Sequence, residues 1–320
     1  MNFIPKADFL EGFCLIKSVE KKMTAKGSTY LDMVLEDNDG EIVAKLWDYK
    51  ETPGNHFEKY DFVKVRGQMN PFNDTIQFRV DRIRKVTPED NVNIDDYVPS
   101  ACLSGELMYE EIENIVFDFR NDELKRLVMA ILEKYREKLV YWPAAKNLHH
   151  AVKGGLLMHT LSILRLANQV CNIYAYVNYE LLCSGVILHD VAKVMEIESS
   201  ETGVPGEYTA RGNLVGHLVM GAIEVDRMGR DLGTSEDTLM LIEHMLISHH
   251  GIPEYGAAKL PMFIEAQVLS MLDDFDAKMY EFSSAVFNVE PGSFTPKQWA
   301  LDNRILYNHG RSEEGGVTLI

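Results

Sequence analysis

Histidine and aspartate side chains are concentrated in one part of this 320-residue sequence. Eight of the ten histidines lie within residues 149–250, so their clustering calls for a chemical explanation. Most of these histidines, and one later aspartate, stand in apolar stretches with helical spacing. The candidates are His159 in GGLLMHTLSI, His189 and Asp190 in GVILHDVAKV, His217 in GNLVGHLVMG, His249 and His250 in LISHHG, and Asp273 in VLSMLDDFDAK.

Imidazole and carboxylate groups inside apolar helices need partners, because burying polar groups without hydrogen bonds or metal is costly. Nitrogen and oxygen donors together suit Mn, Fe, Co, Ni or Zn, and the lack of a CxxC pair argues against a closed structural zinc site. His217 taken alone would more often be a hydrogen-bonded core histidine. The joint pattern instead predicts a metal centre in which the carboxylate of Asp190 can bridge two ions.

The first 90 residues have a different pattern, typical of short β-strands. Five strand-like segments lie between Gly12 and Val86, and Val63 and Val65 alternate with Lys64 and Arg66. Turn signals separate the segments at DNDG and NPFND. Five strands within this length favour a small Greek-key barrel of the oligonucleotide-binding (OB) type.

Barrels of this type bind single strands by stacking bases on aromatic rings and following the backbone with cations. The alternative for each aromatic residue is that it only fills the barrel, since such rings favour burial. The candidate nucleic-acid contacts are Trp47, Lys64, Arg66, Phe72 and Arg79.

The rest of the chain predicts an acidic linker followed by helices. Residues 91–104 are acidic and contain proline, so we expect a linker there and a helical domain with a C-terminal tail over residues 105–320. Asn121 is the expected N-cap of a helix that begins DELKRL. Further helices are predicted over residues 155–174, 179–197, 213–232, 236–248 and 261–286.

The charge of the chain is distributed unevenly. The net charge is −17, but residues 1–90 hold 14 basic and 16 acidic residues, so nearly all the excess acidity belongs to the helical part. The acidic side chains of such helices either lie exposed to water or bind divalent cations. Scattered cysteines, no membrane-length apolar run and no signal-like start lead us to expect a cytoplasmic protein that does not bind membranes.

The order His, HisAsp, His, HisHis, Asp resembles that of the HD-domain metallophosphohydrolases. The segments HHAVKGGLLMHTLSI, GVILHDVAKV, GNLVGHLVMG, LISHHGIPEYG and PGSFTPKQWALDNR are similar to those of the YhaM-type 3′→5′ exoribonucleases, which join an N-terminal OB barrel to a C-terminal HD domain. The resemblance covers nearly the whole chain. It implies two domains, an all-β OB barrel over residues 1–90 and an all-α HD domain over residues 105–320.

The resemblance also implies an activity and a ligand set. Such enzymes release nucleoside 5′-monophosphates from the 3′ end of single-stranded RNA, with single-stranded DNA as a second candidate substrate, and are served by Mn²⁺. We expect two ions per chain, and a homo-oligomer is a further expectation. The core ligands implied are His159, His189, Asp190 and Asp273, and the second-ion ligands are His217 with His249 or His250.

Lys193 and Asp190 are the residues we expect to act directly in catalysis. Lys193 follows His189 by four residues, so its ammonium group could neutralise a phosphate oxygen in the transition state. The alternative is an exposed surface lysine. Asp276 lies near Asp273 in sequence and is expected to orient a ligand.

Two other functions fit the same residues. One is a phosphohydrolase that acts on a nucleotide or cyclic dinucleotide, with the barrel in a regulatory role, because one fold supports many phosphoester substrates. The other is a non-catalytic nucleic-acid-binding regulator. The complete ligand series argues against a regulator, since a retired site has no reason to keep so many titratable groups.

Overall fold

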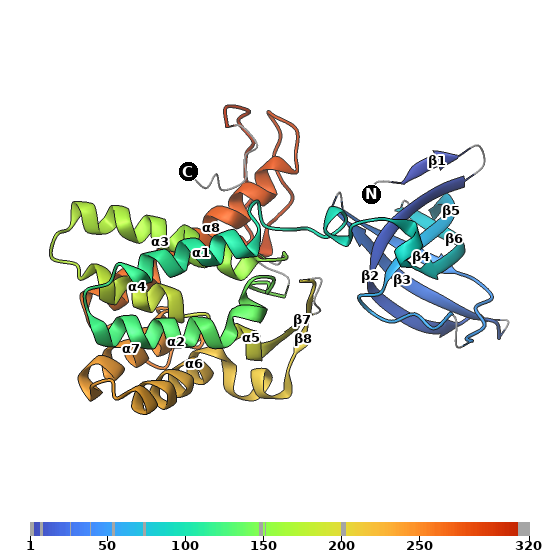
Figure 1. The fold of residues 1–320 in the computed structure, drawn as a ribbon. Coiled ribbons are helices and arrows are strands. Elements are labelled where there is room, and N and C mark those ends of the chain that lie inside the picture. The colour runs from blue at the N-terminus through green and yellow to red at the C-terminus, as the bar shows by residue number, and fades with distance from the viewer. Residues whose placement is uncertain are drawn as a thin grey trace. The chain divides into compact units, whose positions relative to one another are not determined.

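The chain folds into two compact units, residues 1–100 and residues 101–320 (Figure 1). The computed structural model describes residues 3–6, 9–25, 27–38, 40–52, 55–72, 75–146, 150, 152–199 and 203–312. The boundary between the units lies inside the predicted linker over residues 91–104. Tyr97 of this segment packs against the rings of Phe13 and Phe62 in the first unit.

The first unit is a closed β-barrel. Its sheet has the order β1-β2-β3-β4-β6-β5, and β2 pairs again with β5 to close it. The β4–β6 pairing is parallel and the other pairings are antiparallel, as a Greek-key OB barrel requires. The predicted barrel is therefore confirmed. The strands are β1 (Ile4–Lys6), β2 (Phe9–Met23), β3 (Thr29–Asp37), β4 (Gly40–Leu46), β5 (Phe62–Phe72) and β6 (Thr75–Lys85).

Alternation along the strands builds the barrel core. Leu31, Met33 and Leu35 of β3 are buried, as are Val63 and Val65 of β5. The first half of the long strand β2 pairs with β5 and its second half pairs with β3. The β2–β3 pairing contains a register shift between Ile16 and Ser18. The short strand β1, which the sequence pattern did not predict, pairs with the start of β2.

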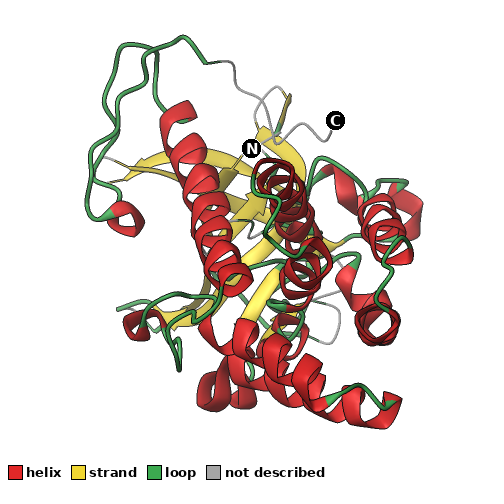
Figure 2. Ribbon diagram, turned by 90° about the vertical axis from the view of Figure 1, so that its left-hand side faces the viewer, coloured by secondary structure: helices red, strands yellow, loops and turns green. Residues whose placement is uncertain are grey.

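The second unit is built mainly from helices (Figure 2). Asn121 caps α2 as predicted, because its side chain accepts hydrogen bonds from the N–H groups of Glu123 and Leu124. No helix in the described part of the chain is long and apolar enough to cross a membrane. The helices are α1 (Gly105–Phe117), α2 (Asp122–Leu139), α3 (Gly155–Ile173), α4 (Tyr179–Leu188), α5 (Lys193–Glu196), α6 (Ala210–Leu232), α7 (Glu236–Ser248) and α8 (Ile264–Phe287).

The helix predicted over residues 179–197 ends earlier than expected. Helix α4 stops at Leu188, a turn follows, and the single-turn α5 leads into a hairpin of β7 (Ile197–Ser199) and β8 (Pro205–Tyr208). The apolar spacing misled the prediction because Val191 in the turn, Val194 in α5 and Ile197 in β7 are all buried, as they would be in a continuing helix. The early end places the turn at His189 and Asp190.

Helix α6 is broken at Gly216. This residue has φ 75° and ψ 156°, a backbone conformation available almost only to glycine. The break frees the N–H of His217, which donates to Oε1 of Glu196 at 2.9 Å. Gly216 thereby directs the chain so that His217 faces the interior.

We predict that Gly216→Ala lowers the free energy of unfolding by about 1–3 kcal/mol, because alanine is strained in this conformation. Gly233→Ala is the matched control, since Gly233 ends the same helix at φ 72° and ψ 28°, a left-handed region that alanine adopts more easily. Urea denaturation followed by circular dichroism measures both. An equal or smaller loss for Gly216→Ala would contradict this account of the break.

Candidate metal centre and barrel surface

The candidate ligands converge although they come from five separate segments. His159 lies on α3, His217 on α6 and Asp273 on α8, while the other four follow the ends of α4 and α7. Their nitrogen and oxygen atoms form overlapping groups in which all members lie within 4.8 Å of one another. These groups are His159–His189–Asp190, His189–His249–Asp273 and His217–His249–His250. The structure thus brings all seven predicted residues into one buried region.

Asp190 lies at the centre of this region. Its Oδ2 is 3.4 Å from Nε2 of His189 and 3.8 Å from Nε2 of His159. Its Oδ1 is 3.2 Å from Nε2 of His217 and 3.8 Å from Nε2 of His249. The two oxygens of one carboxylate therefore face two different sets of imidazoles.

Several of these atoms are buried without a hydrogen-bond partner. Among the described residues, Nε2 of His189 and of His249 lack one, and Nε2 of His217 and Oδ1 of Asp190 have no partner other than each other, at 3.2 Å. Leaving such atoms unsatisfied is expensive, and native structures rarely do so without a functional reason. Three imidazole nitrogens and a carboxylate oxygen that face one another fit a divalent cation, which accepts electron pairs from both donor types.

The ends of the helices fix the orientation of the imidazoles. The last carbonyl groups of a helix have no partner within it, and Nδ1 of His189 and His249 hydrogen-bonds to the carbonyls of Val186 and Leu246 at 2.7 Å each. Nδ1 of His250 likewise contacts a backbone carbonyl at 2.6 Å. With the proton held on Nδ1, the lone pair of Nε2 is left for a metal ion.

Two carboxylates orient the remaining histidines. Oδ2 of Asp276 is 2.8 Å from Nδ1 of His159 and 2.9 Å from Nε2 of His150, and Ser162 also donates to Asp276. Oε2 of Glu196 is 2.9 Å from Nδ1 of His217. Sequence reasoning anticipated a role for Asp276 but missed Glu196, which comes close to His217 only through the unpredicted turn and hairpin.

The charges of the centre suit a metal ion. Burial opposes ionisation of Asp190, but Lys193 and His189 hold the pKa of that carboxyl well below its usual range. Burial opposes ionisation of Asp273 as well, and a hydrogen bond from His159 outweighs it and lowers the pKa. Burial and the neighbouring His250 lower the pKa of His249. Anionic carboxylates and a neutral imidazole are the ligand forms that a cation requires.

Lys193 lies within the centre and not on the surface. Only 8% of it is exposed, and its Nζ is 2.7 Å from Oδ2 of Asp190. Burial lowers the pKa of Lys193, but the carboxylate of Asp190 more than offsets this and raises it. The indole N–H of Trp142 donates to the backbone carbonyl of Lys193 at 3.1 Å and so anchors the turn.

On the barrel, Trp47 is an exposed ring and does not fill the interior. Its side chain is stacked on Tyr30 with ring centroids 4.6 Å apart, and Nζ of Lys45 lies 5.5 and 5.8 Å from the two ring centroids. Trp47, Lys45 and Arg79 line one hollow of about 260 Å³. Tyr30 was missed because only the β3–β4 register brings it beside Trp47.

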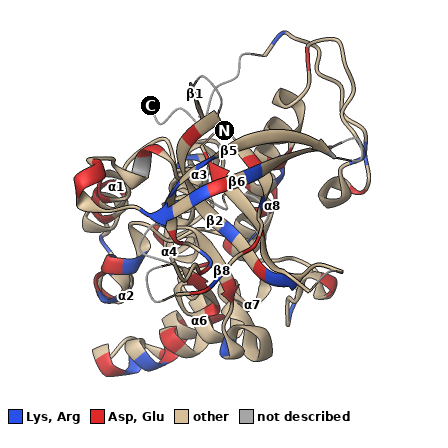
Figure 3. Ribbon diagram, turned by 90° about the vertical axis from the view of Figure 1, so that its right-hand side faces the viewer, with Lys and Arg blue, Asp and Glu red and all other residues tan. Residues whose placement is uncertain are grey.

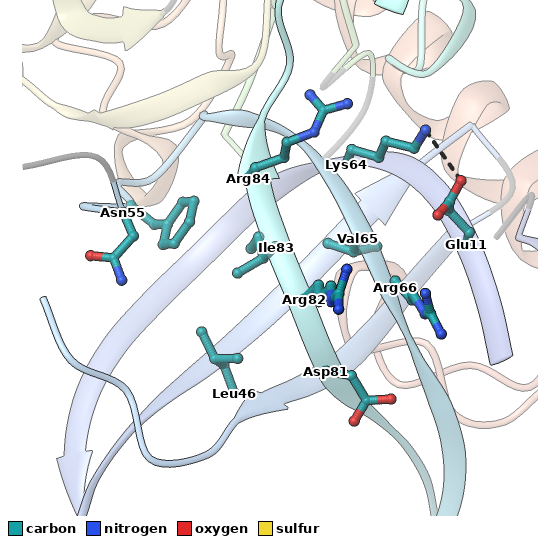
Figure 4. Close-up of a pocket in the computed structure, with 11 residues that line it drawn as sticks. Glu11, Leu46, Asn55, Lys64, Val65, Arg66, Asp81, Arg82, Ile83 and Arg84 are labelled. Atoms are coloured by element: carbon teal, nitrogen blue, oxygen red, sulfur yellow. Dashed lines mark ion pairs between the residues drawn. The ribbon is translucent and has the colours of Figure 1, made fainter. Parts of the chain in front are cut away.

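The other predicted contacts of the barrel lie elsewhere. Lys64 and Arg66 line a second groove, of about 530 Å³, together with Arg82 and Arg84 (Figure 4). The side chain of Phe72 lies outside the part of the chain that the structure describes. The predicted contacts thus separate into two surfaces.

Comparison with known proteins identifies the helical unit and the whole chain. Residues 156–278 match the family model described as HD domain, and residues 98–180 match one described as putative helicase. The HD match contains all seven converging residues. HD domains are metal-dependent phosphohydrolase domains, in agreement with the donor set described above.

Three relatives that match this chain over nearly their full length share one description. A protein of Listeria welshimeri described as 3′-5′ exoribonuclease YhaM is 36% identical over 299 residues, which cover 93% of this chain and 95% of the relative. A protein of Geobacillus sp. with the same description is 36% identical, and the match covers 92% of this chain and 90% of the relative. A protein of Oceanobacillus iheyensis, also with this description, is 33% identical, and the match covers 96% of each chain. The chain therefore belongs to the YhaM family of 3′-5′ exoribonucleases and is a metal-dependent hydrolase of the HD type.

Proposed function

We propose that this chain degrades single-stranded RNA from its 3′ end to nucleoside 5′-monophosphates, with single-stranded DNA as a second substrate. The observation that carries this proposal is the carboxylate of Asp190, which lies between two sets of buried imidazoles. The relatives described as 3′-5′ exoribonucleases support the direction of degradation and the choice of RNA.

The proposed cofactor is a pair of Mn²⁺ ions. His159, His189 and Asp273 would hold the first, and His217, His249 and His250 the second, with one oxygen of Asp190 for each. Nitrogen and oxygen donors without thiolate suit Mn²⁺. When bound, such a pair supplies Lewis acidity and an activated water for hydrolysis of a phosphodiester.

The side chains around the ligands have separate tasks in this proposal. Asp276 and Glu196 orient the imidazoles of His159 and His217 through the hydrogen bonds and ion pairs described above. The buried ammonium of Lys193 keeps Asp190 ionised and neutralises a phosphate oxygen of the substrate as negative charge develops. Water exclusion strengthens these interactions, because charges attract more strongly in a low dielectric.

The barrel supplies binding away from the reacting bond. We assign the stacked pair of half-buried Tyr30 and exposed Trp47 as a stacking platform for bases, since such stacking tolerates any sequence. Lys45 and Arg79 line the same hollow and would contact the phosphates. In this proposal, RNA contacts with the barrel keep the strand bound while its 3′ end is cleaved repeatedly.

The central test uses RNA labelled at either end. With Mn²⁺, 5′-labelled single strands should shorten progressively, and 3′-labelled strands should release labelled nucleoside 5′-monophosphate at once. Asp273→Asn should slow hydrolysis at least about 100-fold, because it weakens a ligand of the centre. The adjacent Asp274→Asn is the matched control, since Asp274 is exposed and paired with Lys278, and it should keep full activity. Equal rates for both variants would remove Asp273 from the mechanism.

The number of ions is a second prediction. Chelator-treated protein should bind two equivalents of Mn²⁺ on titration, and His217→Ala should bind one. His244→Ala is the control and should keep two, because His244 accepts a hydrogen bond from the N–H of Met262 and lies outside the ligand groups. A single equivalent in the unmodified protein would rule out the two-ion centre.

Mn²⁺ affinity should depend on pH in a defined direction. Burial disfavours the charged form of His159, but hydrogen bonds with Asp273 and Asp276 raise its pKa to about 9 in the ion-free centre. An ion must displace this proton, so affinity should fall by up to about tenfold for each pH unit from pH 9 down to pH 7. Calorimetric titrations at pH 7, 8 and 9 measure it, and an unchanged affinity would show that His159 is not a ligand.

A further inference from the structure

Two arginines of the barrel stand opposite each other on neighbouring strands. Arg66 of β5 and Arg82 of β6 are cross-strand partners, and like charges in such positions destabilise a sheet. Arg66 stacks on the ring of Phe9, with its guanidinium carbon 3.4 Å from the ring centroid. Within the described residues, neither arginine forms an ion pair. Glu11 of β2 is the other cross-strand partner of Arg66, but its carboxylate is paired with Lys64 at 3.1 Å. The fold thus holds two guanidinium groups side by side with neither of them in an ion pair.

The groove around this pair has few acids available to neutralise it. Its other cations are already paired. Lys64 is 3.1 Å from Glu11 (Figure 4), and Arg84 is paired with Asp90. Asp81 also lines the groove and lies 3.7 Å from Nε of Arg79. Arg66 and Arg82 are therefore the two groove cations left to bind an external anion.

The surrounding hairpin is locally basic. Residues 62–85 contain six basic residues and two acidic ones, whereas residues 1–90 as a whole carry a net charge of −2. Blue segments recur along β6 in Figure 3. The local excess of positive charge favours a polyanion over a single small acid. The basic residues are Lys64, Arg66, Arg79, Arg82, Arg84 and Lys85.

We propose that the groove at Arg66 and Arg82 binds the phosphate backbone of the same RNA strand whose bases stack on Tyr30–Trp47. Arg79 lines the platform hollow, and Arg82 lies three residues further along the same strand, about 10 Å away. A strand held on the platform therefore brings its own phosphates to the groove. The planar guanidinium groups match phosphate oxygens in bidentate geometry. This inference rests on the proposed action on RNA.

The salt dependence of RNA binding tests the proposal. Anisotropy of a labelled 20-nucleotide single strand, measured in chelator to prevent hydrolysis, gives the affinity of the full chain over a salt series. Arg66→Ala/Arg82→Ala should reduce the slope of log K against log salt by about 1.4, the value for two lost phosphate contacts on a single strand. Arg120→Ala/Arg126→Ala removes the same charge from exposed positions of the helical unit and should leave the slope unchanged.

A second variant separates binding from folding. Arg66→Lys/Arg82→Lys keeps both charges and should keep the salt slope, even if affinity falls because the forked contacts are lost. A loss of slope equal to that of the alanine variant would assign the effect to barrel distortion and overturn the proposal, as would an unchanged slope for the alanine variant.

The salt-slope measurement tests the groove independently of the assay for RNA shortening. If the unmodified protein with Mn²⁺ fails to shorten RNA, the proposed function fails, yet the salt slopes in chelator still decide whether the groove binds phosphate. If RNA is shortened and the slopes of the unmodified and alanine variants agree, the groove proposal fails alone.

Discussion

The arrangement of side chains inside the helical unit is determined by the need to compensate one buried carboxylate, that of Asp190. Asp190 is 2% exposed and is surrounded by imidazoles, of which His189 and His249 have Nε2 atoms without a hydrogen-bond partner among the described residues. Taking a carboxylate out of water costs several kcal/mol unless cations and donors compensate. Lys193 supplies one cation, and the open nitrogens provide places for others. This interior thus contains polar atoms that an apolar core would leave without partners, and the same atoms are the donors that a metal ion would need.

Irregular backbone provides the positions from which the ligands reach this carboxylate. His189 and His249 follow the ends of α4 and α7, where free carbonyls hold their Nδ1 atoms. The break at Gly216 turns His217 inward. Regular helices would place these side chains at fixed angles around their axes. Helix ends and a break instead allow side chains from distant segments to meet at one place.

Much of this arrangement could be predicted from sequence, because metal ligands are chemically distinctive and their spacing survives in the linear order. The seven candidate residues meet, and the alternation in β5 and β6 correctly indicated a barrel. What could not be predicted depends on tertiary contacts. Glu196 approaches His217 only because α4 ends early. Buried Val191 in the turn and buried Ile197 in β7 carry the same apolar signal as they would in a helix. Tyr30 meets Trp47 through strand register, which no local pattern specifies.

The indole of Trp142 has a practical consequence. It is buried against the turn that carries Lys193, whereas Trp47 stands exposed on the barrel. Two of the three tryptophans of the chain therefore lie in different surroundings. Trp142 is shielded from water beside Lys193, and Trp47 is exposed to water at the proposed base-stacking surface. Emission at short wavelength should therefore report on Trp142 of the helical unit, whereas emission at long wavelength should combine Trp47 of the barrel with the exposed Trp299 of the helical unit.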